Sequence, residues 1–256
     1  MRVAWEVTPL SVPPTGIGRY IIGSLGAMAE ARPAWDIRAV AVAEQEGIDR
    51  IAIAYPGVGD EYRDAAPRPP AVVGDRPYLV VVGTTNARKN LLRMLEAYAS
   101  VARERGDLDL VIVGAADVDE PAIREVVDRL GIADRVHRLG YVSDTELAGI
   151  VAASRLLVFP SLYEGFGMPV VEAQAAGVPV AASANPSLDE VCGDAAERFD
   201  PLDVEAMAQA MVRVLDDPVL REGLIARGSA NAAQFTWEAA GEAIASAIEA
   251  TTKSRA

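Results

Sequence analysis

Two glutamates, Glu164 and Glu172, lie on either side of a glycine-rich turn formed by residues 165–168. The turn follows an apolar segment, residues 156–160, and precedes a short apolar helix, so we expect free backbone N–H groups at a helix N-terminus. Such groups bind phosphate, and a carboxylate on each side can accept hydrogen bonds from hydroxyls. The pattern is therefore typical of a site for a diphosphate between two hydroxyl-rich ends, as in a nucleotide sugar. The turn alone also fits an ordinary helix start whose acid suits the helix dipole.

Lys89 is one of only two lysines in the chain, the other being Lys253 near the C-terminus. Together with Arg88, it lies where we expect a helix to begin, although cations are unfavourable at that end of a helix. A bound anion would remove the conflict, and such conflicts concentrate at functional sites. The alternative is that both side chains point into solvent.

The charge of the chain limits its partners. The formal net charge is -13, which argues against a nucleic-acid partner and requires a local cationic patch for any anionic substrate. No apolar run approaches the ~18 residues of a membrane span, and residues 1–6 favour a strand over a signal peptide. Cys192 is the only cysteine, so we expect no internal disulfide, no cysteine metal cluster and a cytoplasmic location.

His137 is the only histidine in the sequence. It lies within a predicted strand, so we expect it to be structural rather than catalytic. Asp144, Asp189 and Glu190 are more typical of helix caps or helix-surface acids than of metal ligands. The sequence therefore predicts no metal site.

Alternating strands and helices must position these residues, and this alternation predicts an α/β fold with a parallel sheet covered on both faces. A strand–helix–strand piece at residues 1–6, 18–30 and 36–43 is followed by a linker that reaches residue 70. The later strands are expected at residues 78–82, 110–113, 136–139, 155–160 and 178–183. The later helices are expected at residues 90–105, 121–131 and 168–176, and another begins at residue 143. Two more helices follow the strand at residues 178–183, and the last helix is expected at residues 236–250.

Five segments resemble the signatures of the family 4 retaining glycosyltransferases (glycosyl transferases group 1), whose GT-B architecture has two Rossmann-like domains. The resemblance runs from about Asp49 to the C-terminus, and the order and spacing of the segments match as well. The resemblance implies a Rossmann-like, doubly wound parallel sheet, the GT-B C-terminal domain. The matching segments are residues 83–90, 138–143, 160–163, 164–172 and 235–237.

The resemblance also implies roles for single residues. Lys89 would contact the donor diphosphate and stabilise the charge on the leaving group, and Glu164 would orient the donor sugar; these two are the expected catalytic residues. Glu172 would bind the ribose hydroxyls, and Arg88 would either support the phosphates or be structural. The other implied donor-binding positions are Tyr141 and Val142 beside the base, and the backbone amides of Gly165, Phe166, Gly167 and Met168.

Gly16 lies in a segment, residues 15–20, that resembles the N-terminal glycine loop of the family, where it would approach the donor phosphates. The competing interpretation is a dinucleotide fingerprint that begins at Gly16 and Gly18. Ile21 stands where that fingerprint needs its third glycine, and the loop after the first strand is too long.

The chain is shorter than the family pattern, because two full Rossmann-like domains need about 300 residues and this sequence has 256. We expect residues 1–48 to be a βαβ remnant of the acceptor domain, 49–235 the nucleotide-sugar-binding domain, and 236–256 a crossover helix and tail. So small a remnant must dock on the larger domain, dimerise or stay poorly ordered. The N-terminal histidine typical of the family has no counterpart here.

The implied reaction moves a hexose from GDP-mannose or UDP-glucose to an acceptor hydroxyl with retention, without a metal or another cofactor. Residues 83–90 favour the mannosyltransferases, whereas nothing in the sequence identifies the acceptor. Because the acceptor domain is short, we expect this chain alone to be inactive unless a homo-oligomer or a complementing subunit supplies the missing acceptor side of the active-site cleft. The alternative is a non-catalytic nucleotide-sugar-binding remnant or partner subunit.

Overall fold

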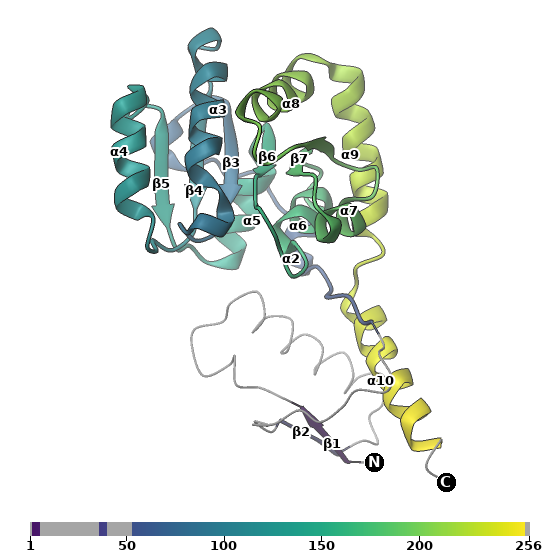
Figure 1. The fold of residues 1–256 in the computed structure, drawn as a ribbon. Helices are drawn as coiled ribbons and strands as arrows, with labels where there is room; N and C mark the ends of the chain where they lie inside the picture. The colour runs from purple at the N-terminus through teal and green to yellow at the C-terminus, as the bar shows by residue number, and fades with distance from the viewer. Residues whose placement is uncertain (1, 6–35, 40–52, 254–256) are drawn as a thin grey trace. The chain divides into compact units, whose positions relative to one another are not determined.

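The computed structural model describes residues 2–5, 36–39 and 53–253. The chain divides into two units (Figure 1). One unit comprises Asp60–Ala233. The other comprises Met1–Gly59 together with Gln234–Ala256, and is called the terminal unit below.

The Asp60–Ala233 unit is built on a six-stranded sheet with the order β5-β4-β3-β6-β7-β8 (Figure 1). Every pair of neighbours is parallel. The order runs outward in both directions from the central pair, β3 and β6, so the predicted doubly wound parallel sheet is confirmed. The strands are β3 (Tyr78–Val82), β4 (Asp109–Val113), β5 (Val136–Gly140), β6 (Leu156–Phe159), β7 (Val180–Ser183) and β8 (Glu197–Phe199).

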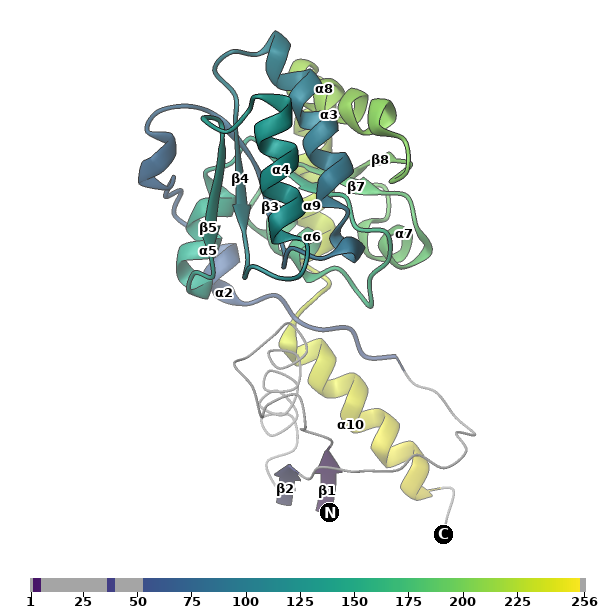
Figure 2. The ribbon, with the colours of Figure 1, turned by 60° about the vertical axis from the view of Figure 1, so that its left-hand side comes forward.

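Helices cover both faces of this sheet. On one face α3 packs against α4 and α8, and Figure 2 shows α3 and α4 in front of the sheet. On the other face α6 packs against α2, α5 and α9, and α9 also contacts α8 of the first face. The helices of this unit are α2 (Asp60–Arg63), α3 (Leu91–Glu104), α4 (Glu120–Leu130), α5 (Asp144–Ala152), α6 (Met168–Ala175), α7 (Pro186–Cys192), α8 (Val204–Asp216) and α9 (Pro218–Ala232), with 3-10 turns η2 (Ala71–Val73) and η3 (Ala87–Lys89).

The apolar strands explain why both faces are covered. Leu79 and Val81 of β3 join the core cluster that contains Met94 and Tyr98 of α3. Val80, between them, is equally buried and, because side chains alternate along a strand, points to the opposite layer. A strand that is apolar at every position therefore needs helices on both of its faces.

Most of the predicted helix ends are present. Gly131 caps α4 in the left-handed conformation, with φ 66°, and the Ser143 hydroxyl accepts a hydrogen bond from the Glu146 N–H at 3.3 Å. The sequence analysis missed β8 and one of the helices α7, α8 and α9. β8 has only three residues, two of them charged, and it lies at the edge of the sheet, where one side lacks a partner strand. Such a strand carries little apolar signal.

In the terminal unit, β1 (Arg2–Trp5) and β2 (Asp36–Ala39) form a parallel pair in which Arg2 lies opposite Asp36. Both strands lie within the predicted ranges, residues 1–6 and 36–43. The other residues of these ranges, and the helix predicted at residues 18–30, lie outside the described residues. Helix α10 (Trp237–Lys253) begins after Thr236, whose hydroxyl accepts a hydrogen bond from the Ala239 N–H at 3.1 Å, as expected of an N-cap. The predicted domain boundaries at residues 48 and 235 stay predictions.

The start of α10 contacts residues 55–58 of the same unit. The rings of Tyr55 and Phe235 meet edge to face, with centroids 5.9 Å apart, and the Val58 N–H donates to the Phe235 carbonyl at 2.9 Å. A Cβ atom on Gly57 would lie 2.3 Å from the backbone nitrogen of Trp237. Because that atom belongs to the backbone and cannot move aside cheaply, only glycine fits at this position.

This contact predicts that Gly57→Ala destabilises the terminal unit, by roughly 1–3 kcal/mol of overpacking. All three tryptophans, Trp5, Trp35 and Trp237, belong to this unit, so tryptophan fluorescence reports its unfolding alone. We expect a lower urea midpoint for the fluorescence transition.

The matched control is Gly106→Ala, because a Cβ atom on Gly106 would meet nothing within 4 Å. Equal fluorescence midpoints for the two variants would show that the contact at Gly57 does not support α10.

Candidate functional site

The central strands β3 and β6 mark the point from which the strand order runs in opposite directions. Ligands of open parallel sheets bind outside the carboxyl ends of the strands at such a point. The loop after β3 carries Lys89, and the loop after β6 carries Glu164. The fold therefore brings together the two residues that the sequence analysis selected as catalytic.

Arg88 and Lys89 lie directly before the helix α3, where the sequence analysis expected a helix to begin. They form the end of the 3-10 turn η3, and α3 starts only at Leu91. Asn90, between the two, has a left-handed backbone with φ 55°, which interrupts the helix. The predicted start of the helix near Asn90 is confirmed to within one residue, whereas the 3-10 turn that the left-handed asparagine separates from it was not predicted.

Asn90 is a positioning residue whose individual role the sequence analysis missed. It is buried, and its side-chain amide donates to the Pro160 carbonyl at 3.1 Å and to the Pro201 carbonyl at 2.7 Å. These bonds connect the Lys89 turn to the segments that follow β6 and β8. The sequence signal was available, since asparagine is among the few residues that adopt the left-handed conformation easily.

Two glycines provide the room for the Lys89 side chain. A Cβ atom on Gly83, which follows β3, would lie 2.7 Å from Cε of Lys89. A Cβ atom on Gly114, which follows β4, would lie 2.1 Å from the Gly83 carbonyl oxygen. Both glycines have positive φ, 152° and 148°, so larger residues are excluded by conformation as well as by space.

Glu164 is paired with two cations. Its Oε1 lies 2.7 Å from Nζ of Lys89, and its other carboxylate oxygen pairs with Nη1 of Arg88. Arg88 also donates to the Tyr163 carbonyl at 3.3 Å. Nζ of Lys89 lies 4.8 Å from the centre of the Phe159 ring. Two cations against one carboxylate leave an excess positive charge at this edge of the sheet, where an anion would be attracted.

Burial and the ion pair act in opposite directions on the pKa values of Lys89 and Glu164. Burial lowers the pKa of the Lys89 ammonium, and the charge and hydrogen bond of Glu164 oppose that effect without cancelling it. Burial also raises the pKa of Glu164, but Lys89, the Ser161 hydroxyl and Arg88 together hold it below its ordinary value. At neutral pH, Glu164 is therefore a carboxylate that holds the buried ammonium in place.

The glycine-rich turn leads from Glu164 into α6. Gly167 is the N-cap of α6, with φ 113°, and a Cβ atom there would lie 2.7 Å from a methyl group of Leu188. Gly165 is exposed, whereas Phe166 and Met168 are half-buried. Glu172 lies one turn further along α6 and is only 3% exposed. Gly167 is buried, so the turn where the sequence analysis expected phosphate is open to solvent mainly at Gly165.

Tyr141 and Val142 follow β5, the edge strand of the sheet. Tyr141 is 73% exposed, so its ring is free to stack on a ligand. Gly16 lies outside the described residues.

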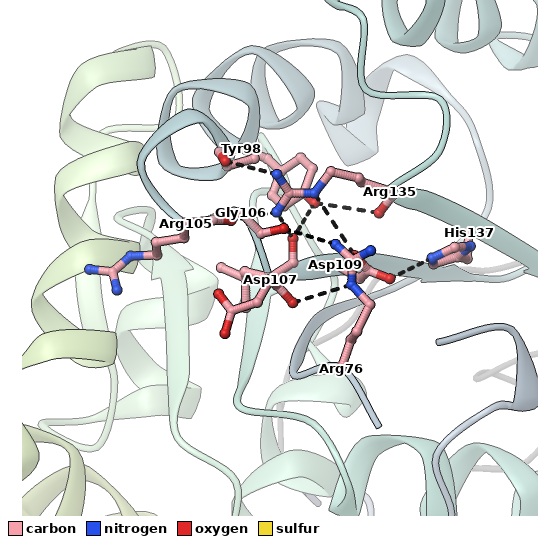
Figure 3. A network of polar contacts seen from close by, with 10 residues as sticks. Arg76, Tyr98, Arg105, Gly106, Asp107, Asp109, Arg135 and His137 are labelled. Carbon is pink, nitrogen blue, oxygen red and sulfur yellow. Dashed lines mark hydrogen bonds and ion pairs between the residues drawn. The ribbon is translucent and has the colours of Figure 1, made fainter. Parts of the chain in front are cut away.

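His137 lies away from this site, toward the amino end of β5 (Figure 3). Its Nε2 is 2.8 Å from the carboxylate of Asp109, which also pairs with Arg76 at 2.8 Å and is almost fully buried. Because Asp109 is the first residue of β4, this network holds the amino ends of the strands together. The position fits the structural role expected from the sequence.

Within the described ranges, no group of three or more histidine, cysteine or acidic side chains is arranged to hold a metal ion. None of the helices in these ranges combines the length and the apolar character that crossing a membrane requires.

Comparisons with known proteins agree with this geometry. Residues 63–231 match the family described as Glycosyl transferases group 1. The chain is 40% identical over 162 residues to O-antigen chain mannosyltransferase B from Escherichia coli, covering 63% of this chain and 42% of that protein. It is 36% identical over 154 residues to MMP alpha-(1->4)-mannosyltransferase from Mycolicibacterium hassiacum, covering 59% and 37%.

Among solved structures, sucrose-phosphate synthase from Thermosynechococcus elongatus superposes with a TM-score of 0.66 at 24% identity, covering 89% of this chain and 57% of that chain. This likeness shows the fold. The chain spans less than half the length of the two mannosyltransferases described above.

The ion pair predicts that Glu164→Gln lowers the free energy of unfolding of the Asp60–Ala233 unit. The change leaves Lys89 buried without its counter-charge, which costs about 3 kcal/mol or more. Far-UV circular dichroism during urea unfolding would measure the loss. In the native chain, the contribution of Glu164 is complete above pH 4.5, its ordinary pKa, and is lost as the pH falls through the lowered folded value.

Glu96→Gln is the control, because it breaks an exposed pair with Arg129, 3.1 Å long, which contributes at most about 1 kcal/mol. A similar loss in both variants would contradict the assignment of Glu164 as the partner of a buried charge. Adding Lys89→Met to Glu164→Gln should recover part of the stability.

Proposed function

Because this chain belongs to the glycosyl transferases group 1 family, we propose that its Asp60–Ala233 unit binds the diphosphate of a nucleotide sugar. The observation that carries this proposal is the buried ammonium of Lys89 at the carboxyl ends of β3 and β6, beside the turn that opens α6. A diphosphate at this position would accept hydrogen bonds from Lys89 and from the backbone of the turn.

We propose that the bound donor gives its hexose to an acceptor hydroxyl with retention of configuration. The bond between the anomeric carbon and the diphosphate oxygen breaks, and a new bond forms to the acceptor oxygen. The acceptor proton passes to the leaving phosphate, so no protein base is needed. Lys89 stabilises the growing negative charge on the leaving group, and Glu164 orients the sugar. No metal enters this mechanism.

The donor proposal favours GDP-mannose over UDP-glucose. Both relatives described above are mannosyltransferases by name. Residues 83–90, the segment around Lys89, also resemble the mannosyltransferases of the family. Glu172 would hold the ribose hydroxyls, and Tyr141 and Val142 would border the base. The choice of acceptor depends on residues outside the Asp60–Ala233 unit.

A second candidate function is a nucleotide-sugar-binding module without transferase activity, such as a partner subunit. The observation that favours it is that Lys89, Glu164 and the turn that opens α6, the parts of the proposed donor site, all lie in the Asp60–Ala233 unit. The two candidates share the donor site and differ only in whether the chain forms a glycosylated product.

The donor proposal predicts that Lys89→Ala weakens the binding of GDP or UDP roughly tenfold to a hundredfold, because one charge-assisted contact is lost. Isothermal titration calorimetry would measure it. The control is Arg103→Ala, which removes the same charge from an exposed position near the end of α3. Equal affinities for Lys89→Ala and the control would contradict the diphosphate site.

The same titration separates the roles within the site. Glu172→Ala should weaken the binding of the nucleoside diphosphate much more than the binding of inorganic pyrophosphate, because pyrophosphate has no ribose hydroxyls for Glu172 to hold. An equal loss for both ligands would exclude the ribose role.

We also predict that the chain alone releases nucleotide slowly from GDP-mannose and does not glycosylate acceptors over many turnovers. Positioning donor and acceptor together can supply about 7–11 kcal/mol of the barrier, and the proposed site has only its donor side in the Asp60–Ala233 unit. The measurement is released nucleotide and glycosylated product, with and without simple acceptors. Sustained product formation would overturn this prediction and imply that a homo-oligomer completes the site.

A further inference from the structure

A pocket of about 300 Å³ lies at the amino ends of the strands, whereas the Lys89–Glu164 pair lies at their carboxyl ends. Three of its residues, Pro77, Leu108 and Arg155, directly precede the strands β3, β4 and β6. Lys89 and Glu164 come from the loops that follow the same central strands. Because β3 has five residues, the two edges of the sheet are about 16 Å apart. The pocket is therefore separate from the proposed donor site.

Three arginines, Arg105, Arg155 and Arg221, line this pocket in a protein whose formal net charge is -13. Arg105 follows α3 and pairs with Asp216 at the end of α8. Figure 3 shows its side chain pointing away from the Asp109 network. Arg221 donates from Nη1 to the carbonyl of Leu215 at 3.1 Å. Each guanidinium carries five N–H donors, so these contacts use only part of the capacity of either side chain.

Arg155 is different, because within the described part of the chain its guanidinium makes no hydrogen bond or ion pair. Only its backbone N–H is engaged, donating to the Tyr78 carbonyl at 2.9 Å. Arg155 is exposed, so its guanidinium meets solvent and not another part of the described chain. A ligand in the pocket can therefore bind this guanidinium without breaking a contact within the protein.

The side chains around the pocket, counted without the helix ends, carry a formal charge of about +1. Asp107 lines it, and Asp216 is already paired with Arg105, so three cations face two carboxylates. The carboxyl ends of α3 and α8 add partial negative charge nearby. The excess cation is Arg155, which no described acid neutralises. The remaining walls, from Pro77, Leu108 and Leu215, are apolar.

We propose that this pocket binds a phosphoryl group on a compact ligand other than the sugar donor. Guanidinium groups match the oxygens of a phosphate in pairs, and three arginines line this pocket. The volume is at the lower end of that of ligand pockets, which suits a small phosphorylated molecule or a phosphorylated headgroup. A ligand bound here makes contact with the segments before β3, β4 and β6 and leaves the loops after these strands free.

The test is an NMR titration of the isotopically labelled full chain with inorganic phosphate. Phosphate should shift the amide signals of residues 105–108 and of Arg155, in addition to any shifts at the turn of residues 165–168. Arg155→Ala should weaken the binding of phosphate at the pocket, as followed by these shifts, about tenfold. The fold should stay intact, because the side chain has no partner to lose. Arg221→Ala should weaken this binding similarly.

Arg124→Ala is the control, because it removes the same charge from an exposed position on α4, away from the pocket. Lys89→Ala should abolish shifts only at residues 165–168, which separates failure of this proposal from failure of the donor site. Sedimentation with phosphatidylglycerol vesicles, against phosphatidylcholine, distinguishes a headgroup from a soluble ligand. Absence of shifts at residues 105–108 and 155, or shifts unchanged by Arg155→Ala, would overturn the proposal.

Discussion

The burial of a single ammonium group, that of Lys89, is the constraint on which the arrangement of the site depends. A buried cation needs an acidic partner, and Glu164 supplies it from a segment 75 residues away in the sequence. That pairing joins the loop after β3 to the loop after β6. Since these strands are the central neighbours of the sheet, the pair stands where a doubly wound fold leaves space for a ligand. In the proposed complex, a diphosphate takes over part of the role of Glu164 as the anion beside Lys89.

The surrounding residues keep that space open and hold the segments around it in position. Gly83 and Gly114 allow the backbone and the Lys89 side chain to approach more closely than any side chain at these positions would permit. Asn90 fixes the turn that carries Lys89 by donating hydrogen bonds to two carbonyls on other segments. At the opposite edge, Asp109 and its cationic partners hold the amino ends of the strands. The two edges of one sheet thus present two different cationic environments, one proposed for the donor and one for another phosphoryl group.

The fold could be predicted from the sequence because the central strands β3 and β6 are continuously apolar and most of the helices have clear ends. The same sequence reasoning placed Lys89 beside the site and directly before a helix, but it did not predict the 3-10 turn or the left-handed Asn90 that separates this turn from α3. The Lys89–Glu164 bond could not be read from periodicity, since it depends on which strands become neighbours. The arginine pocket was invisible for the same reason, as Arg105, Arg155 and Arg221 meet only through the packing of α3, α8 and α9 around the sheet.

The most direct test of the central claim observes Lys89 itself. The chain has two lysines, so selective ¹⁵N labelling of lysine gives an NMR spectrum with two side-chain ammonium signals, which Lys89→Arg assigns. On addition of GDP or UDP, we expect the Lys89 signal alone to shift and to show a correlation to ³¹P across the hydrogen bond. A nucleotide that binds while the Lys89 signal stays unchanged would contradict the account.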